Sequence, residues 1–146
     1  MTMPNPYITM PFGIAIIVGM NLLGHYLPPI SLFTTPFYLT LIVVFLNKDL
    51  FVWNFHIATI FAFLLLLFND LSLRLYAGGS HDLEGKGLCS AMSGMSFLII
   101  CIAIFIKSFQ GKKPKIVLLR LFTLAIAAVS AFILYAFFRT VSNCSL

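Results

Sequence analysis

The chain has 146 residues, of which 61% are hydrophobic and only 9% are charged, and its formal net charge is +5. Soluble domains carry about a quarter charged residues, so this composition excludes an ordinary soluble protein and indicates a membrane protein. The basic residues gather at the edges of apolar segments, which is typical of membrane topology and argues against binding to nucleic acid.

Two short apolar runs open the chain, at residues 11–27 and 30–46, and Pro28 and Pro29 separate them. Proline cannot continue a helix, so the pair predicts two helices with a sharp break between them. Each run is close to the shortest length that crosses a bilayer. We expect both to span the membrane; a partly inserted hairpin is the alternative.

Three longer apolar runs follow, at residues 50–73, 88–107 and 116–138. The pattern of the first continues to about Tyr76, and a helix of that length would project beyond the hydrocarbon core. The prediction is an all-α polytopic integral membrane bundle of five transmembrane helices, with four as the alternative. The spans take up nearly all of residues 1–146, so we expect a single transmembrane domain and no soluble domain.

The charges of the loops predict the orientation of the bundle. The loop at residues 107–115 contains four lysines and no acidic residue, so it should face the cytoplasm. Alternation of the spans then places the loop at residues 74–87 outside, whether there are four spans or five.

The segment at residues 69–90 differs most from the rest, with three of the four acidic residues and four of the nine glycines. It does not have the spacing of a phosphate-binding loop, because five residues separate Gly79 from Gly85 and Lys86 precedes a glycine. We interpret it as an external surface for a partner. A cation site that uses its carboxylates is the alternative.

The candidate residues of this segment are polar or aromatic. They are Asp70, Arg74, Tyr76, His81, Asp82, Glu84 and Lys86. Asp70 and Arg74 are one helical turn apart, so they can form an ion pair, which lowers the cost of holding charge near lipid. An ion relay or an anion-binding Arg74 is the alternative interpretation.

Four polar residues lie inside the predicted spans: Asn21, His25, Asn54 and His56. Such residues usually form hydrogen bonds between helices. Haem held by the two histidines is not expected, because five spans place His25 near the outer edge and His56 near the inner edge. The sequence predicts neither a cofactor nor a metal site.

Cys89 and Cys144 are both predicted to lie outside, where a disulfide between them can form. Catalytic residues are not predicted, because Ser80 and His81 are adjacent and this geometry activates a serine poorly.

The leading hypothesis is a non-catalytic membrane subunit of a larger membrane or cell-envelope complex, which docks through residues 69–90. Its expected partners are the lipid bilayer and other membrane-protein subunits. One alternative is a small ion or solute transporter component that uses Asp70 and Arg74. A second alternative is a membrane enzyme that acts on a lipid or envelope substrate.

Overall fold

A computed structural model describes residues 6–46, 50–51, 54–75, 83–110 and 113–144 of the chain. Within these ranges, several residues near helix ends are described by their helical backbone alone. They are residues 6–9, 28–29, 31, 45–46, 83–86, 138–139 and 141–144.

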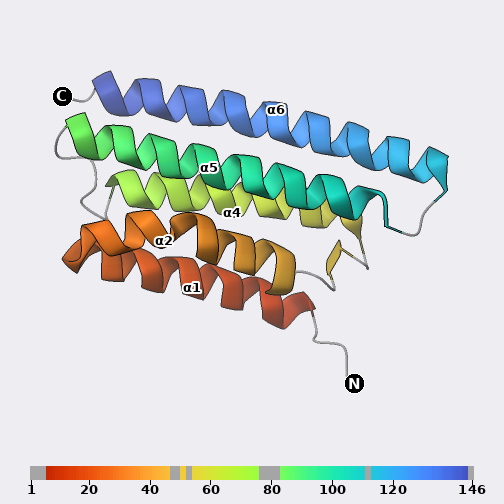
Figure 1. Cartoon of the computed structure of the whole chain (residues 1–146), viewed down its shortest axis with the longest axis horizontal. Coiled ribbons are helices and arrows are strands. Elements are labelled where there is room, and N and C mark those ends of the chain that lie inside the picture. Colours follow the sequence, from red (N-terminus) through yellow and green to blue (C-terminus); the bar gives the residue numbers. More distant parts are fainter. Residues whose placement is uncertain (1–5, 47–49, 52–53, 76–82, 111–112, 145–146) are drawn as a thin grey trace.

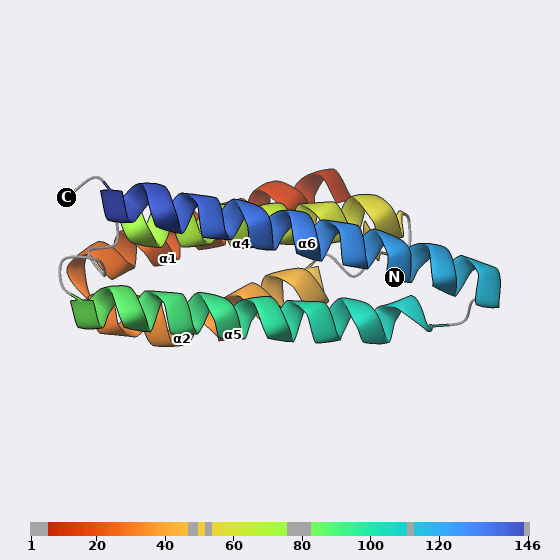
Figure 2. The same ribbon diagram turned by 90° about the horizontal axis from the view of Figure 1, so that it is seen from above.

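The described part of the chain is helical and contains no strand. Its elements are α1 (Pro6–Tyr26), α2 (Pro28–Leu41), the one-turn π-helix η1 (Ile42–Leu46), α4 (Phe55–Leu75), α5 (Leu83–Ser108) and α6 (Pro114–Cys144). Successive α-helices run in alternating directions, so the bundle has an up-and-down topology (Figures 1 and 2). The prediction of an all-α fold is confirmed.

Prolines and one asparagine determine where several helices begin. Pro28 opens α2 and Pro114 opens α6, positions at which the missing N–H of proline would have no partner within the helix. Asn54 caps α4, since its Oδ1 accepts hydrogen bonds from the backbone N–H groups of His56 (3.1 Å) and Ile57 (3.2 Å). The helix α4 therefore begins at Phe55, whereas the predicted span in the same region starts at residue 50.

Among the described residues, three helical segments are long and apolar enough to cross a membrane: Phe55–Leu75, Gly87–Ser108 and Pro114–Phe137. The apolar parts of the first two helices, Met10–Tyr26 and Leu32–Val44, are shorter. In both views these two helices end well before α5 and α6 at the end that carries the α5–α6 connection (Figures 1 and 2).

The helix α4 forms the centre of the bundle and contacts each of the other four α-helices. Half of its most apolar stretch is buried, against 28% for α5 and 17% for α6. The hydrophobic core consists of aliphatic and aromatic side chains such as Ile17, Leu39 and Ile104, and eight polar or charged residues are also buried. The outer helix α6 instead exposes large apolar side chains such as Leu118 and Phe122, a surface that suits lipid or another apolar partner.

Candidate functional site

A buried ion pair lies near the C-terminal end of α4. Arg74 Nε donates to Asp70 Oδ2 at 2.9 Å, and the two side chains are only 7% and 6% exposed. They are one helical turn apart, in the order that favours pairing along a helix. Asp70 is the only carboxylate among the side chains that the structure describes.

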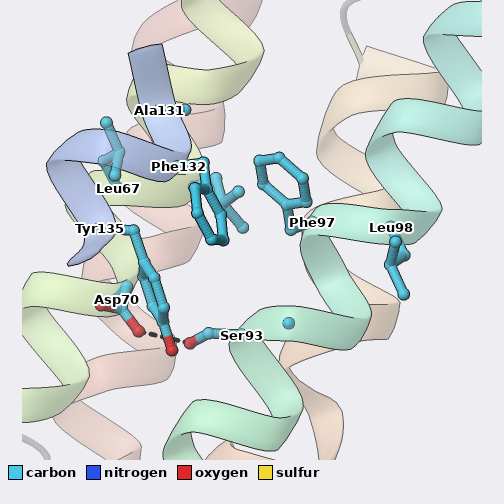
Figure 3. Close-up of a pocket in the computed structure, with 10 residues that line it drawn as sticks. Leu67, Asp70, Ser93, Phe97, Leu98, Ala131, Phe132 and Tyr135 are labelled. Atoms are coloured by element: carbon cyan, nitrogen blue, oxygen red, sulfur yellow. Dashed lines mark hydrogen bonds between the residues drawn. The ribbon is translucent and has the colours of Figure 1, made fainter. Parts of the chain in front are cut away.

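Residues of α5 and α6 form further hydrogen bonds with this ion pair. Ser93 Oγ donates to Asp70 Oδ1 at 2.5 Å, so both carboxylate oxygens accept a hydrogen bond. Arg74 Nη2 donates to Ser90 Oγ and to the hydroxyl of Tyr135, both at 3.3 Å. The close-up shows Tyr135 reaching down from α6 toward Ser93 and Asp70 (Figure 3).

The neighbouring residue Asn69 forms hydrogen bonds with helices on another face of α4. Successive residues of a helix point about 100° apart, so Asn69 faces α1 and α2 while Asp70 faces α5 and α6. Asn69 Oδ1 accepts hydrogen bonds from the hydroxyl of Tyr38 (2.5 Å) and from Nδ2 of Asn21 (3.2 Å). The same Nδ2 also donates to the carbonyl of Ile17 at 2.9 Å.

These contacts form two hydrogen-bonded clusters on different faces of α4, which together we call the polar layer. Its members are Asn21, Tyr38, Asn69, Asp70, Arg74, Ser90, Ser93 and Tyr135. Each α-helix contributes at least one of them. A buried ion pair is stable only when its remaining donors and acceptors are satisfied, and the layer supplies these partners. Its first role is therefore to hold five helices together close to the α4–α5 connection.

A pocket of about 300 Å³ opens beside the ion pair, between α4, α5 and α6. Asp70, Ser93 and Tyr135 lie at one end of the pocket. Apolar side chains line the rest, and Phe97 of α5 and Phe132 of α6 face each other across it (Figure 3).

The other end of the bundle holds its cations differently. Lys107 Nζ donates to the carbonyl of Val44 at 3.2 Å and lies 4.4 Å from the centre of the Phe51 ring. The guanidinium of Arg120 lies 4.7 Å from the centre of the Phe55 ring. Both rings are buried, so each cation contacts a desolvated aromatic face.

The four polar residues predicted within the spans have different environments. Asn21 and His56 form hydrogen bonds between helices; His56 Nδ1 lies 2.7 Å from Oγ1 of Thr123 on α6. His25 is exposed and its ring packs edge-on against Tyr26. Asn54 caps its own helix and makes no contact to another helix through its capping oxygen.

Much of the predicted external segment lies outside the described residues. This applies to Tyr76, His81 and Asp82, and to the side chains of Glu84 and Lys86. Cys89 is buried near the start of α5. The side chain of Cys144 is not described, so the disulfide stays a prediction.

Sequence reasoning identified Asp70 and Arg74 but missed Tyr38, Asn69, Ser90, Ser93 and Tyr135. The missed residues lie 16 to 61 positions from their partners, and such contacts depend on how the helices pack. One signal was available: two adjacent polar residues, at 69 and 70, interrupt a long apolar helix and therefore face two different neighbours.

The part of the chain that the structure describes contains no group of three His, Cys, Asp or Glu side chains that could hold a metal ion. No protein-family model, curated protein or solved structure matches the chain.

Proposed function

We propose that the chain is a non-catalytic integral membrane subunit of a larger membrane or cell-envelope complex. It docks to a partner through the segment that joins α4 to α5. The observation that carries this proposal is the polar layer, which ties all five α-helices together close to that segment. A bonded, buried network gives the segment a rigid base.

Because the ion pair is buried, we do not include it in the docking surface. Asp70 and Arg74 are enclosed by the helices, so they position the segment and do not themselves contact a partner. The contacts then belong to the residues between and just after the two helices. These are Tyr76, His81, Asp82, Glu84 and Lys86, a mixture of aromatic and charged groups of both signs.

The same geometry disfavours the alternative of a transporter that uses Asp70. Both oxygens of this carboxylate already accept hydrogen bonds. Farther along the bundle, the buried hydroxyls of Thr59, Ser96 and Ser108 each donate to a carbonyl of their own helix. The described residues therefore supply no continuous polar path. Ion flux into liposomes that is lost in Asp70→Asn would instead support transport.

We also propose five spans, with the N-terminus and the 107–115 loop in the cytoplasm and residues 76–82 outside. The alternating helix directions and the lysines of that loop support this topology. In a variant whose three cysteines are replaced by alanine, an impermeant maleimide should label Ser80→Cys on intact cells. It should label Lys113→Cys only after permeabilisation. The opposite pattern would reverse the orientation.

Isolation of the native complex tests the docking proposal. The tagged chain, purified in a mild detergent from its own cells, should bring down a partner in a fixed ratio. A combined His81→Ala, Asp82→Ala and Glu84→Ala variant should lose that partner. The matched control is Lys113→Ala with Lys115→Ala, which changes exposed charges at the other end of the bundle and should retain it.

Two results would contradict the proposal. The first is a single monodisperse species without a partner, isolated from cells in which the chain is at its natural level. The second is a partner that remains bound to the loop variant and is lost from the control, which would place the interface at the lysine end.

A further inference from the structure

The two ends of the bundle differ in net charge. The helix α4 begins, α5 ends and α6 begins at the same end (Figure 1). The sequence from 47 to 54 and from 107 to 120, which belongs to this end, contains six of the nine basic residues and one of the four acidic residues. The remaining basic and acidic residues are equal in number and cancel. The whole formal net charge of +5 therefore comes from the end with the α5–α6 connection.

The exposed cations at this end have no counter-ion within the described part of the chain. Lys113 and Lys115 are exposed, and neither forms an ion pair there. The one carboxylate among the described side chains, Asp70, is bonded to Arg74 at the opposite end. The two lysines can therefore pair with an anion that comes from outside the chain.

The first turns of α6 carry Lys115 beyond the start of α4. Arg120 contacts the ring of Phe55, the first residue of α4, so residues 114–119 extend about 9 Å past that level. Both views show α6 reaching farther than α1, α2 and α4 at this end (Figures 1 and 2). The projecting part also exposes Leu118 (70%) and Leu119 (55%). These lie three and four positions after Lys115, so cationic and apolar side chains are neighbours on the helix surface.

This combination matches the boundary between water and lipid. The exposed apolar surface of α6 continues from Leu119 through Phe122 and Ile126, which suits contact with acyl chains. A lysine beside such a surface can extend its ammonium group to the headgroups while its aliphatic stem stays on the apolar side. An acidic protein would also attract the lysines. Lipid is the partner that matches both the charge and the apolar surface that continues from it.

We propose that Lys113 and Lys115 bind the headgroup of an anionic phospholipid, and that Leu118 and Leu119 contact its acyl chains. We call these four residues the basic patch. Each lysine close to an anionic membrane surface raises the affinity about 5-fold. This inference goes beyond the docking function, because it concerns the opposite end of the bundle and a lipid in place of a protein partner.

Native mass spectrometry of the purified full chain in detergent tests the proposal. The probes are phosphatidylglycerol, which has a net negative charge, and phosphatidylcholine with the same acyl chains, which has none. The chain should bind phosphatidylglycerol about 5- to 30-fold more tightly than phosphatidylcholine. More ammonium acetate should reduce this preference, because salt screens exposed charges. Equal affinity for the two lipids would overturn the proposal.

Three variants test whether the lysines cause the preference. Lys115→Gln should lower the affinity for phosphatidylglycerol about 5-fold, and Lys113→Gln combined with Lys115→Gln should abolish the preference. Lys113→Arg combined with Lys115→Arg keeps the charge and should retain it, which separates loss of charge from a disturbed fold. Arg139→Gln is the matched control, since it removes one cation near the other end of α6 and should change nothing. A preference that survives in the double glutamine variant would overturn the proposal.

A headgroup without acyl chains distinguishes a lipid from a soluble anion. Glycerophosphoglycerol should displace phosphatidylglycerol only weakly, because it cannot contact Leu118 and Leu119. Displacement at the concentration at which the whole lipid competes would overturn the proposal. The docking partner should be retained when both lysines are replaced, so this inference and the docking proposal can fail separately.

Discussion

The two ends of the bundle keep cationic side chains next to apolar helices in different ways. At the end with the polar layer, Arg74 is neutralised by a buried carboxylate and bonded to α5 and α6. At the opposite end, Lys107 and Arg120 lie over the rings of Phe51 and Phe55. The first arrangement consists of two hydrogen-bonded clusters on different faces of α4, whereas the second consists of separate pairs.

This difference has an energetic consequence. In a network, one substitution leaves several buried groups without partners, so its cost is large and the costs of two substitutions do not add. In separate pairs, a substitution removes one contact and a cation can still extend to water along its flexible chain. We call the end with the Phe51 and Phe55 rings the aromatic end. Substitutions should therefore cause large, coupled losses of stability at the polar layer and small, additive losses at the aromatic end.

The largest effect is expected from Asp70→Asn, which leaves the buried Arg74 charge without a counter-ion. Removal of one member of a buried ion pair costs about 3–5 kcal/mol. The free energy of unfolding, measured by denaturant titration in detergent micelles, should fall by this amount. The combined Asp70→Asn and Arg74→Gln variant should recover part of the loss. A double variant that loses the sum of the two single losses would show that the residues are not coupled.

A smaller loss is expected from Ser93→Ala, which removes one hydrogen bond to the Asp70 carboxylate. Hydrogen bonds to charged groups contribute about 1.5–3 kcal/mol. The matched control is Ser130→Ala on α6, where the side chain is exposed and the same change should have little effect on the unfolding free energy. In an Asp70→Asn background the loss should shrink; an unchanged loss would contradict a shared network.

At the aromatic end, Arg120→Gln removes the cation over the Phe55 ring and should cost about 1–2 kcal/mol, since the ring is buried. Lys115→Gln, an exposed cation one turn or so earlier on α6, is the control and should change stability little. Combined with Ser93→Ala, the two losses should add, because the sites lie at opposite ends of the bundle. Strong non-additivity would mean that the ends are coupled.

The all-α fold and the contacts between residues close in sequence could be predicted from the sequence. Contacts between different helices could not. The break at Pro28 follows from the covalent structure of proline, and Asp70 pairs with Arg74 because four residues make one turn. Both features depend on local geometry. They can therefore be predicted without knowledge of the helix packing.

The polar layer could not be predicted in this way. Whether Tyr135 meets Arg74 depends on the rotation of α6 about its own axis, and a helix that is apolar all round gives no pattern from which to infer that rotation. The apolar run of the sequence likewise gives no sign of where α4 begins, because Leu50 and Phe51 precede the capping residue Asn54 in the same hydrophobic run.

The smallest effect is expected from Asn54→Ala at the aromatic end. The substitution removes the acceptor for the N–H groups of His56 and Ile57, and loss of such a cap costs about 1 kcal/mol. Asn54→Ser keeps a capping oxygen and should cost only a few tenths of that. Hydrogen exchange should accelerate in the first turn of α4 and stay unchanged around Asp70. Faster exchange at Asp70 would show that this cap also supports the polar layer, and the two ends would then not be independent.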